Sequence, residues 1–246
     1  MVDAEVPKER KRDRMRRYMR VPLSVRTSDL PKRAASAVVM LAVSGLALWV
    51  GGAVWTLFVA AVAIGVFFEW TVLTFLFTDK GLPRLAWRVS GMVYCAIAAV
   101  MLVLLRDGPD GLFAILMAVG AVIGTDVGAY FAGRTIGGPK IAPLISPSKT
   151  WAGLGGGMLG ATVVLLAIGA GREGIGLSVP LLILAGVLTA IVAQAGDFFE
   201  SWMKRRAGVK DSGKLIPGHG GLFDRVDGLL AVLFVLGVIF TVSHVV

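Results

Sequence analysis

The stretch of residues 217–242 reads PGHGGLFDRVDGLLAVLFVLGVIFTV. Its second half, 229–242, is almost entirely apolar, whereas its first half holds Asp224, Arg225 and Asp227. A long apolar run is typical of a helix that crosses a membrane, and acids within such a helix usually face a cavity, a partner or an ion. This stretch therefore predicts a membrane helix that begins in a polar site.

The rest of the chain repeats the apolar pattern. Of its 246 residues, 56% are hydrophobic and only 17% are charged, whereas soluble domains carry about a quarter charged residues. The apolar residues form seven long blocks, at about 34–50, 53–77, 88–105, 111–133, 152–171, 179–203 and 222–246. We therefore predict an all-α fold, a polytopic integral membrane helical bundle with about seven transmembrane helices and a polar pocket on its cytoplasmic side. No internal repeat is evident.

The basic residues predict the orientation of the bundle. With the N-terminus in the cytoplasm, 23 of the 25 Lys and Arg residues fall on the cytoplasmic side, and only Arg106 and Arg172 fall outside. Basic residues favour the cytoplasmic side of membrane proteins. We therefore expect a multi-pass protein of the cell inner (cytoplasmic) membrane, with the N-terminus and the site in the cytoplasm. Residues 1–33 would form a basic cytoplasmic tail.

Acidic residues recur at one depth of the bundle. Each lies in the cytoplasmic third of an apolar segment, on four segments in all: Glu69, Asp126, Asp197, Glu200, Asp224 and Asp227. Carboxylates without His or Cys are ligands that suit Mg²⁺. The alternative is that they only pair with neighbouring cations such as Lys204, Arg205 or Arg225. Convergence on one site open to the cytoplasm is the functional hypothesis.

Spacing places several of these acids on shared helix faces. Gln194, Asp197, Ser201 and Lys204 follow a 3-4-3 rhythm that makes one stripe, and Asp126 shares a face with Tyr130 and Arg134. Basic residues surround the acids: Lys149, Lys204, Arg205, Lys210, Lys214 and Arg225. Acids that hold a metal, together with cations that hold phosphate oxygens, indicate transfer of a phosphoryl or nucleotidyl group.

Two loops add groups that can bind phosphate. PGHGG (217–221) is unsuited to a helix, and the backbone N–H groups of such a glycine-rich turn can approach a phosphate. His219 can donate to a phosphate or transfer a proton, or else it packs the loop. ISPSKTW (145–151) precedes a glycine-rich helix, whose N-terminus attracts anions. Alternatively, Ser148 or Thr150 caps that helix.

The stretch SWMKRRAGVKDSGKLIPGHGGLFDRVD (201–227) resembles the signature of the phosphatidate cytidylyltransferases, or CDP-diacylglycerol synthases. The matching positions are Ser201, Lys204, Arg205, Lys210, Asp211, Pro217, His219, Gly220, Gly221, Asp224, Arg225 and Asp227. QAGD (194–197), DVGAYFAGR (126–134) and SPSKT (146–150) extend the resemblance upstream. The chain departs from the family where Ser148 replaces a common lysine, Ala152 a glutamate and Gly228 a serine.

The resemblance implies that the protein transfers CMP from CTP to phosphatidic acid, giving CDP-diacylglycerol and pyrophosphate in phospholipid biosynthesis. It implies Mg²⁺ as cofactor, with room for a second metal ion, held by Asp197, Asp224 and Asp227. The residues expected to act in catalysis are Asp197, Lys204, Arg205, Lys210, Asp211, His219 and Arg225. Those expected to bind substrate are Ser146, Lys149, Thr150, Ser201, Asp126, Tyr130, Gly220 and Gly221.

The resemblance covers roughly residues 124–228, and the first hundred residues match the family only in being apolar helices. Residues 34–110 would form the N-terminal membrane helices and 111–246 the catalytic membrane domain. CTP, phosphatidic acid and membrane lipids are the expected partners; no nucleic acid is expected, and a homodimer is left open.

Three other functions compete with this one. DRVDG (224–228) resembles the opening of the CDP-alcohol phosphatidyltransferase motif, but the apolar continuation lacks the later aspartates. A CTP-dependent lipid kinase would use similar groups. A transporter would use the acids to carry ions, although the paired inverted repeats that favour transport are not evident.

Overall fold

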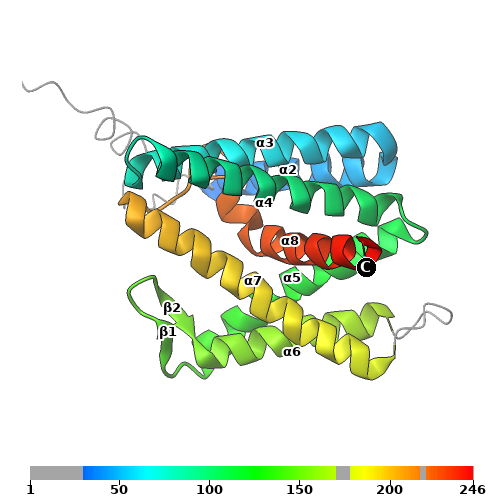
Figure 1. The fold of residues 1–246 in the computed structure, drawn as a ribbon. Helices are drawn as coiled ribbons and strands as arrows, with labels where there is room; N and C mark the ends of the chain where they lie inside the picture. Colours follow the sequence, from blue (N-terminus) through cyan, green and yellow to red (C-terminus); the bar gives the residue numbers. More distant parts are fainter. Residues whose placement is uncertain (1–29, 170–177, 217–219, 246) are drawn as a thin grey trace, which may run out of the picture.

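The computed structural model describes residues 30–169, 178–216 and 220–245. Seven helices and one two-stranded hairpin follow one another within these ranges (Figure 1). The helices are α2 (Leu30–Val50), α3 (Gly52–Phe77), α4 (Leu82–Asp107), α5 (Gly111–Thr135), α6 (Trp151–Gly169), α7 (Val179–Ala207) and α8 (Phe223–Val245). They coincide with the seven apolar segments, which confirms the all-α bundle. Most of the predicted basic tail and His219 lie outside the described residues.

Six of these helices, α3 to α8, are long and apolar enough to cross a membrane, and α2 adds a shorter apolar part, Ala34–Val50. Large apolar side chains are exposed on the outer surface of the bundle, among them Trp49, Leu57 and Ile64. In water such a surface would be costly, whereas in a bilayer it meets lipid. The chain is therefore a multi-pass membrane protein.

Local signals explain where several helices begin and end. Pro83 and Pro180 stand in the first turns of α4 and α7, where the missing N–H of proline leaves no helical bond unmade. Gly208 ends α7 in the left-handed conformation and donates its N–H to the carbonyls of Lys204 and Arg205. Helix α4 thus begins at Leu82, six residues before the apolar pattern alone would start it.

The apolar pattern does not predict the hairpin between α5 and α6. Strand β1 (Lys140–Ala142) pairs antiparallel with β2 (Ser146–Thr150), and the register shifts between Lys140 and Ala142. The guanidinium Nε of Arg205, near the end of α7, donates to the carbonyl of Ile145 in the hairpin turn at 3.2 Å. The hairpin is thus anchored beside the end of α7, at the left of Figure 1.

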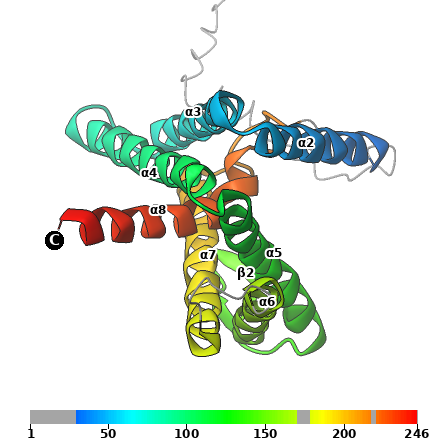
Figure 2. The same ribbon diagram turned by 90° about the vertical axis from the view of Figure 1, so that its right-hand side faces the viewer.

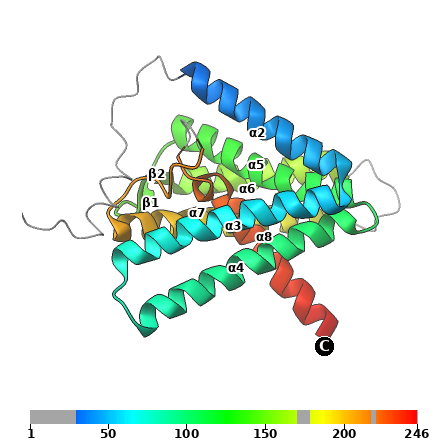
Figure 3. The same cartoon turned by 90° about the horizontal axis from the view of Figure 1, so that it is seen from above.

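The helices form two groups that meet along α7 and α8. Helices α2, α3 and α4 lie on one side of α8, and α5, α6 and α7 lie on the other (Figures 1 and 2). Seen from above, the C-terminal end of α8 projects past α4 (Figure 3). The main buried cluster joins both groups, with Trp70 and Leu73 of α3, Met203 of α7 and Phe223 of α8 among its members. The division of the chain at residue 110 stays a prediction.

Helices α5 and α6 approach each other through glycine. A Cβ atom at Gly128 would overlap the carbonyl of Gly156, and one at Gly156 would overlap the Ala132 side chain and the Gly128 carbonyl. Close backbone packing of this kind is typical of small residues at helix interfaces in membranes. It fixes the start of α6, and with it β2, against the part of α5 that carries Asp126.

Candidate active site

The C-terminal half of α7 carries the centre of the candidate site. Asp197, Glu200, Ser201 and Lys204 follow one another there at helical spacing, as the sequence predicts. The Ser201 hydroxyl donates to the Asp197 carboxylate at 3.3 Å. Glu200 is completely buried, whereas the Asp197 side chain is 36% exposed. Solvent or a ligand can therefore reach the Asp197 carboxylate but not the Glu200 carboxylate.

Two lysines hold the acids of this stripe. Lys149 of β2 forms an ion pair with Asp197, and its ammonium group lies 4.6 Å from the centre of the Phe198 ring. Lys204 lies between two carboxylates, 2.5 Å from Glu200 Oε2 and 2.7 Å from Asp224 Oδ1. A buried carboxylate is stable only when a partner compensates its charge. These ion pairs connect β2, α7 and α8.

Asp224, in the first turn of α8, has partners on both carboxylate oxygens. Its Oδ1 faces Lys204, and its Oδ2 accepts hydrogen bonds from the Ser212 and Gly221 backbone N–H groups at 2.8 and 2.9 Å. The Ser212 hydroxyl is also 2.9 Å from Oδ2. Asp224 therefore fixes the loop between α7 and α8 to the start of α8.

Asp227 lies one turn further along α8, where this helix crosses α7. Its Oδ1 accepts the N–H of Gly228 at 2.7 Å, and it interacts electrostatically with Asp197. The crossing is tight, because a Cβ atom at Gly196 would come within 2.7 Å of the Asp227 carbonyl oxygen. Asp197 also interacts with Asp126 of α5. Asp197 is therefore influenced by the negative charge of one acid on α8 and one on α5.

A polar cavity of about 330 Å³ lies beside Asp197, between α5, β2, the start of α6 and α7. Its lining includes Asp126, Tyr130, Arg134, Ser148, Lys149, Thr150, Gln194 and Asp197. Gln194 is only 6% exposed, and its side-chain amide nitrogen has no hydrogen-bond partner among the described residues. A buried donor without a partner is costly unless a ligand or water fills that role.

The SPSKT segment contributes one charged group to this cavity. Lys149 reaches Asp197, whereas Thr150 is buried and its hydroxyl oxygen accepts the N–H of Gly153 at 3.0 Å. Thr150 therefore caps α6, the alternative that the sequence left open for it, while also lining the cavity. Ser146 is buried at the start of β2.

Other residues expected in the site are exposed or only partly buried. Lys210, Arg205 and Arg225 are exposed, and Asp211 is partly buried next to Gly220. Tyr130 lines the polar cavity, and its hydroxyl lies 3.4 Å from the Arg134 guanidinium. The structure therefore connects Asp126, Lys149, Asp197, Ser201, Lys204, Asp224 and Asp227 through ion pairs, hydrogen bonds and electrostatic interactions.

Sequence reasoning gave no role to Ser212 and no partner to Glu69. Glu69 of α3 is 1% exposed and lies 2.8 Å from the Ser212 hydroxyl. In the sequence, Glu69 could be singled out because it is a charged residue inside an apolar run. Ser212 could not be singled out, because a serine in a polar loop is ordinary.

The donor set suits a hard divalent cation in its chemistry, because it consists of carboxylate and hydroxyl oxygens around a polar cavity. Within the described ranges, however, no three acids stand close enough to form a ready-made metal site. Instead, Asp197 forms an ion pair with Lys149, and Asp224 forms one with Lys204. Metal binding by these acids would require the lysines to turn away.

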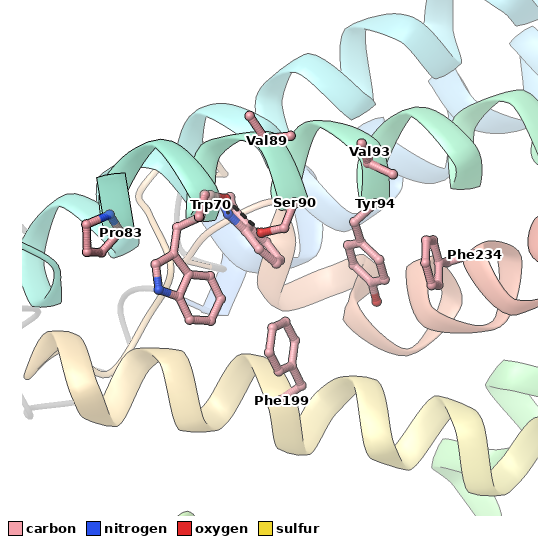
Figure 4. A pocket seen from close by; sticks show the side chains of 10 residues that line it. Trp70, Pro83, Val89, Ser90, Val93, Tyr94, Phe199 and Phe234 are labelled. Carbon is pink, nitrogen blue, oxygen red and sulfur yellow. Dashed lines mark hydrogen bonds between the residues drawn. The ribbon is translucent and has the colours of Figure 1, made fainter. Parts of the chain in front are cut away.

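A second, larger recess of about 880 Å³ lies on the other side of α7, toward α4 (Figure 4). Aromatic side chains line it from four helices: Trp70 of α3, Trp87 and Tyr94 of α4, Phe199 of α7 and Phe234 of α8. Figure 4 shows Phe199 and Tyr94 pointing toward each other across it. Because Phe199 is two residues from Asp197, this apolar recess and the polar cavity flank the same acids.

Comparison with known proteins adds independent information. The model of the "Cytidylyltransferase family" matches residues 72–243. The phosphatidate cytidylyltransferase of Brucella melitensis is 37% identical over 259 residues, which covers 87% of this chain and 95% of the relative. That of Rickettsia bellii is 33% identical over 82% of this chain and 87% of the relative. The phosphatidate cytidylyltransferase of Pseudomonas aeruginosa is 37% identical over 151 residues, which cover 60% of this chain and 55% of the relative.

Proposed function

The chain belongs to the cytidylyltransferase family, and on that premise we propose that it is a phosphatidate cytidylyltransferase. It transfers CMP from CTP to phosphatidic acid, and the products are CDP-diacylglycerol and pyrophosphate. The observation that carries this proposal is the group of acids and lysines on α7 and α8, between a polar cavity and an apolar recess. A water-soluble and a lipid substrate can meet there.

The reaction joins two phosphates. An oxygen of the lipid phosphate attacks the α-phosphorus of CTP, a new P–O bond forms, and the bond to the β-phosphate oxygen breaks so that pyrophosphate leaves. A phosphate monoester is largely a dianion near neutral pH, so the attack needs no strong general base. The protein's task is to position the two phosphates and to stabilise their negative charge.

The lysines at the centre of the site suit this task. Lys149 and Lys204 are now paired with acids on α7 and α8, and each can turn to a phosphate oxygen when substrate enters. Arg205, Lys210 and Arg225 surround them on exposed positions and attract the triphosphate. Gln194 offers its unpaired amide group to the part of CTP that enters the polar cavity.

The recess lined by Trp70, Tyr94, Phe199 and Phe234 suits an acyl chain of the lipid substrate. An acyl chain that moves from the bilayer into this recess leaves an apolar surrounding of lipid for an apolar surrounding of aromatic side chains. Its entry should therefore cost little free energy. The lipid phosphate would then lie near the crossing of α7 and α8, beside Asp197 and Asp227.

Mg²⁺ is the proposed cofactor, and Asp197, Asp224 and Asp227 are the residues that would hold it. When bound, it supplies positive charge that stabilises the crowded phosphate oxygens. Asp227 is the most available of the three, because among the described residues only its Oδ1 accepts a hydrogen bond, whereas Asp197 and Asp224 have partners on both oxygens.

The proposed location follows from the substrates. CTP is dissolved in the cytoplasm, so the site is proposed to open on the cytoplasmic face of the inner membrane, as the distribution of basic residues predicts. A homodimer stays a prediction.

A substrate-choice assay tests the proposed function. The purified chain in detergent, with Mg²⁺, is expected to release pyrophosphate from CTP in the presence of phosphatidic acid. Diacylglycerol in place of phosphatidic acid lacks the attacking phosphate, so it should give no release above background. Equal release with both lipids, or none with phosphatidic acid from folded protein, would refute the proposal.

A further inference from the structure

Glu69 stands apart from every residue assigned to the site above. It lies on α3, far from the signature in sequence, and its side chain is 1% exposed. A charged group so deeply buried needs strong partners to be stable. The pattern of those partners indicates what it does.

The Glu69 carboxylate accepts three hydrogen bonds from the segment that leads into α8. Its Oε1 accepts the Leu222 N–H at 3.0 Å, and its Oε2 accepts the Phe223 N–H at 2.8 Å and faces the Ser212 hydroxyl at 2.8 Å. The first N–H groups of a helix have no partner within the helix, and they carry its positive dipole end. Glu69 thus caps α8 from a different helix.

The loop is shaped to meet this carboxylate. A Cβ atom at Gly221 would lie 2.5 Å from Glu69 Oε2 and would overlap the Ser212 hydroxyl, so only glycine lets the backbone pack there. Gly213 meets the other oxygen of Glu69 in the same way. Two points of the loop, at Gly213 and at Gly221, therefore pack against one side chain of α3.

From Glu69 the contacts continue into the site. The Ser212 hydroxyl lies 2.9 Å from Asp224 Oδ2, and Asp224 Oδ1 lies 2.7 Å from the Lys204 ammonium group. Ser212 has one hydroxyl proton, so it can donate to only one of Glu69 and Asp224 at a time. Ser212 therefore connects Glu69 to Asp224, and Asp224 in turn contacts Lys204.

We infer that Glu69 is a positioning residue of the transfer reaction: it holds Ser212 and the start of α8 so that Asp224 and Lys204 are aligned for the phosphates of CTP. The inference rests on the proposed function. It assigns to α3 a part in binding the nucleotide, although no residue of α3 lines the polar cavity.

The variant Glu69→Gln keeps the shape of the side chain but replaces one acceptor oxygen by a donor. Depending on its orientation, that amide group would face the N–H of Leu222 or that of Phe223, so one bond of the cap would be broken and the loop loosened. We expect the KM for CTP to rise roughly tenfold, while the KM for phosphatidic acid changes less than about twofold. Ser212→Ala should act in the same direction, and the double variant should resemble Glu69→Gln alone, because the two act through one path.

A matched control separates positioning from simple loss of stability. Trp55 lies at the other end of α3, where its indole N–H donates to the Leu102 carbonyl at 3.4 Å, so Trp55→Phe also removes a contact of this helix. A smaller folded fraction lowers the maximal rate and leaves both KM values unchanged. Trp55→Phe should show only that behaviour. A KM for CTP in Glu69→Gln equal to that of the unchanged protein would overturn the inference.

Trypsin digestion gives a readout that does not depend on activity. Lys210 and Lys214 are exposed in the loop that Glu69 holds, so Glu69→Gln should be cleaved there faster than both the unchanged protein and Trp55→Phe. Unaltered cleavage would show that Glu69 does not hold the loop. Faster cleavage in a chain that never forms CDP-diacylglycerol would refute the proposed function, and the role in binding with it, but leave the capping of α8 standing.

Discussion

Among single residues, Lys204 has the most demanding position. Its ammonium group is shared by Glu200, which is completely buried, and by Asp224. The second oxygen of Glu200, Oε1, has no hydrogen-bond partner among the described residues. We therefore expect Glu200 to keep Lys204 in place, and Asp224 to be the partner that Lys204 leaves when it turns to a substrate phosphate.

Removal of Lys204 should affect stability and activity separately. Lys204→Met leaves the buried Glu200 charge uncompensated, which costs about 3–5 kcal/mol. The double variant Lys204→Met/Glu200→Gln removes that charge, so its melting temperature in detergent should return toward that of the unchanged protein. Its pyrophosphate release should stay low. Recovery of the rate together with stability would mean that Lys204 only balances charge.

Asp227 should matter for the reaction and little for folding. Asp227→Asn keeps the acceptor for the Gly228 N–H but removes the negative charge beside Asp197. We expect turnover to fall by roughly 100-fold or more, as for loss of a main electrostatic group. Asp107→Asn, an exposed change in the last turn of α4, is the control and should keep its rate. Comparable rates in both variants would exclude Asp227 from the site.

At the scale of elements, the contact of α5 with α6 sets the shape of the polar cavity. Asp126 comes from α5, Lys149 from the strand before α6, and the two helices meet through glycine. Neighbouring glycines of α6 differ in this respect. Gly156 faces α5 closely, whereas a Cβ atom at Gly155 would meet nothing within 4 Å.

This difference makes a matched pair. Gly156→Ala should separate α5 from α6, lower the melting temperature and raise the KM for CTP, because the cavity wall moves. Gly155→Ala should leave both quantities within error, and alanine favours a helix more than glycine does. The measurements are thermal unfolding and initial rates in detergent. Similar behaviour of the two variants would show that this contact does not shape the cavity.

The sequence predicts much at this scale, because apolar blocks and helical spacing are local properties. The helices α2 to α8 and the stripe of Asp197, Ser201 and Lys204 follow from them. The hydrogen bond between Glu69 and Ser212 does not, because it joins residues 143 positions apart and depends on how α3 packs. The ion pair of Lys149 with Asp197 likewise depends on the β1–β2 hairpin. The strands of this hairpin are short and irregular, so the apolar pattern of the sequence does not predict them.

At the scale of the whole molecule, the candidate site lies between an apolar recess and a polar cavity. The apolar recess and the polar cavity lie on two sides of α7, and α8 begins between the two groups of helices (Figures 1 and 4). Because α8 begins at the site and is long and apolar enough to cross a membrane, we expect its C-terminal end on the opposite side of the membrane from the site.

A reporter at the C-terminus tests that orientation. Fused after Val246, a phosphatase that is active only outside the cytoplasm should be active, and a fluorescent protein that folds only inside should be dark. The reverse pattern would place the site on the outer face, away from CTP. The same pair of reporters fused after Gly137, which follows α5 at the end of the molecule that carries the site, should give the opposite result.

We propose that the chain transfers the nucleotidyl group of CTP to a lipid phosphate. The most direct measurement follows the label from CTP labelled at either the α- or the γ-phosphorus, with phosphatidic acid and Mg²⁺. We expect the α-label to enter the lipid phase as CDP-diacylglycerol, while the γ-label stays in water as pyrophosphate in equal amount. Transfer of the γ-label to lipid would indicate a kinase, and no label in the lipid phase would contradict the account.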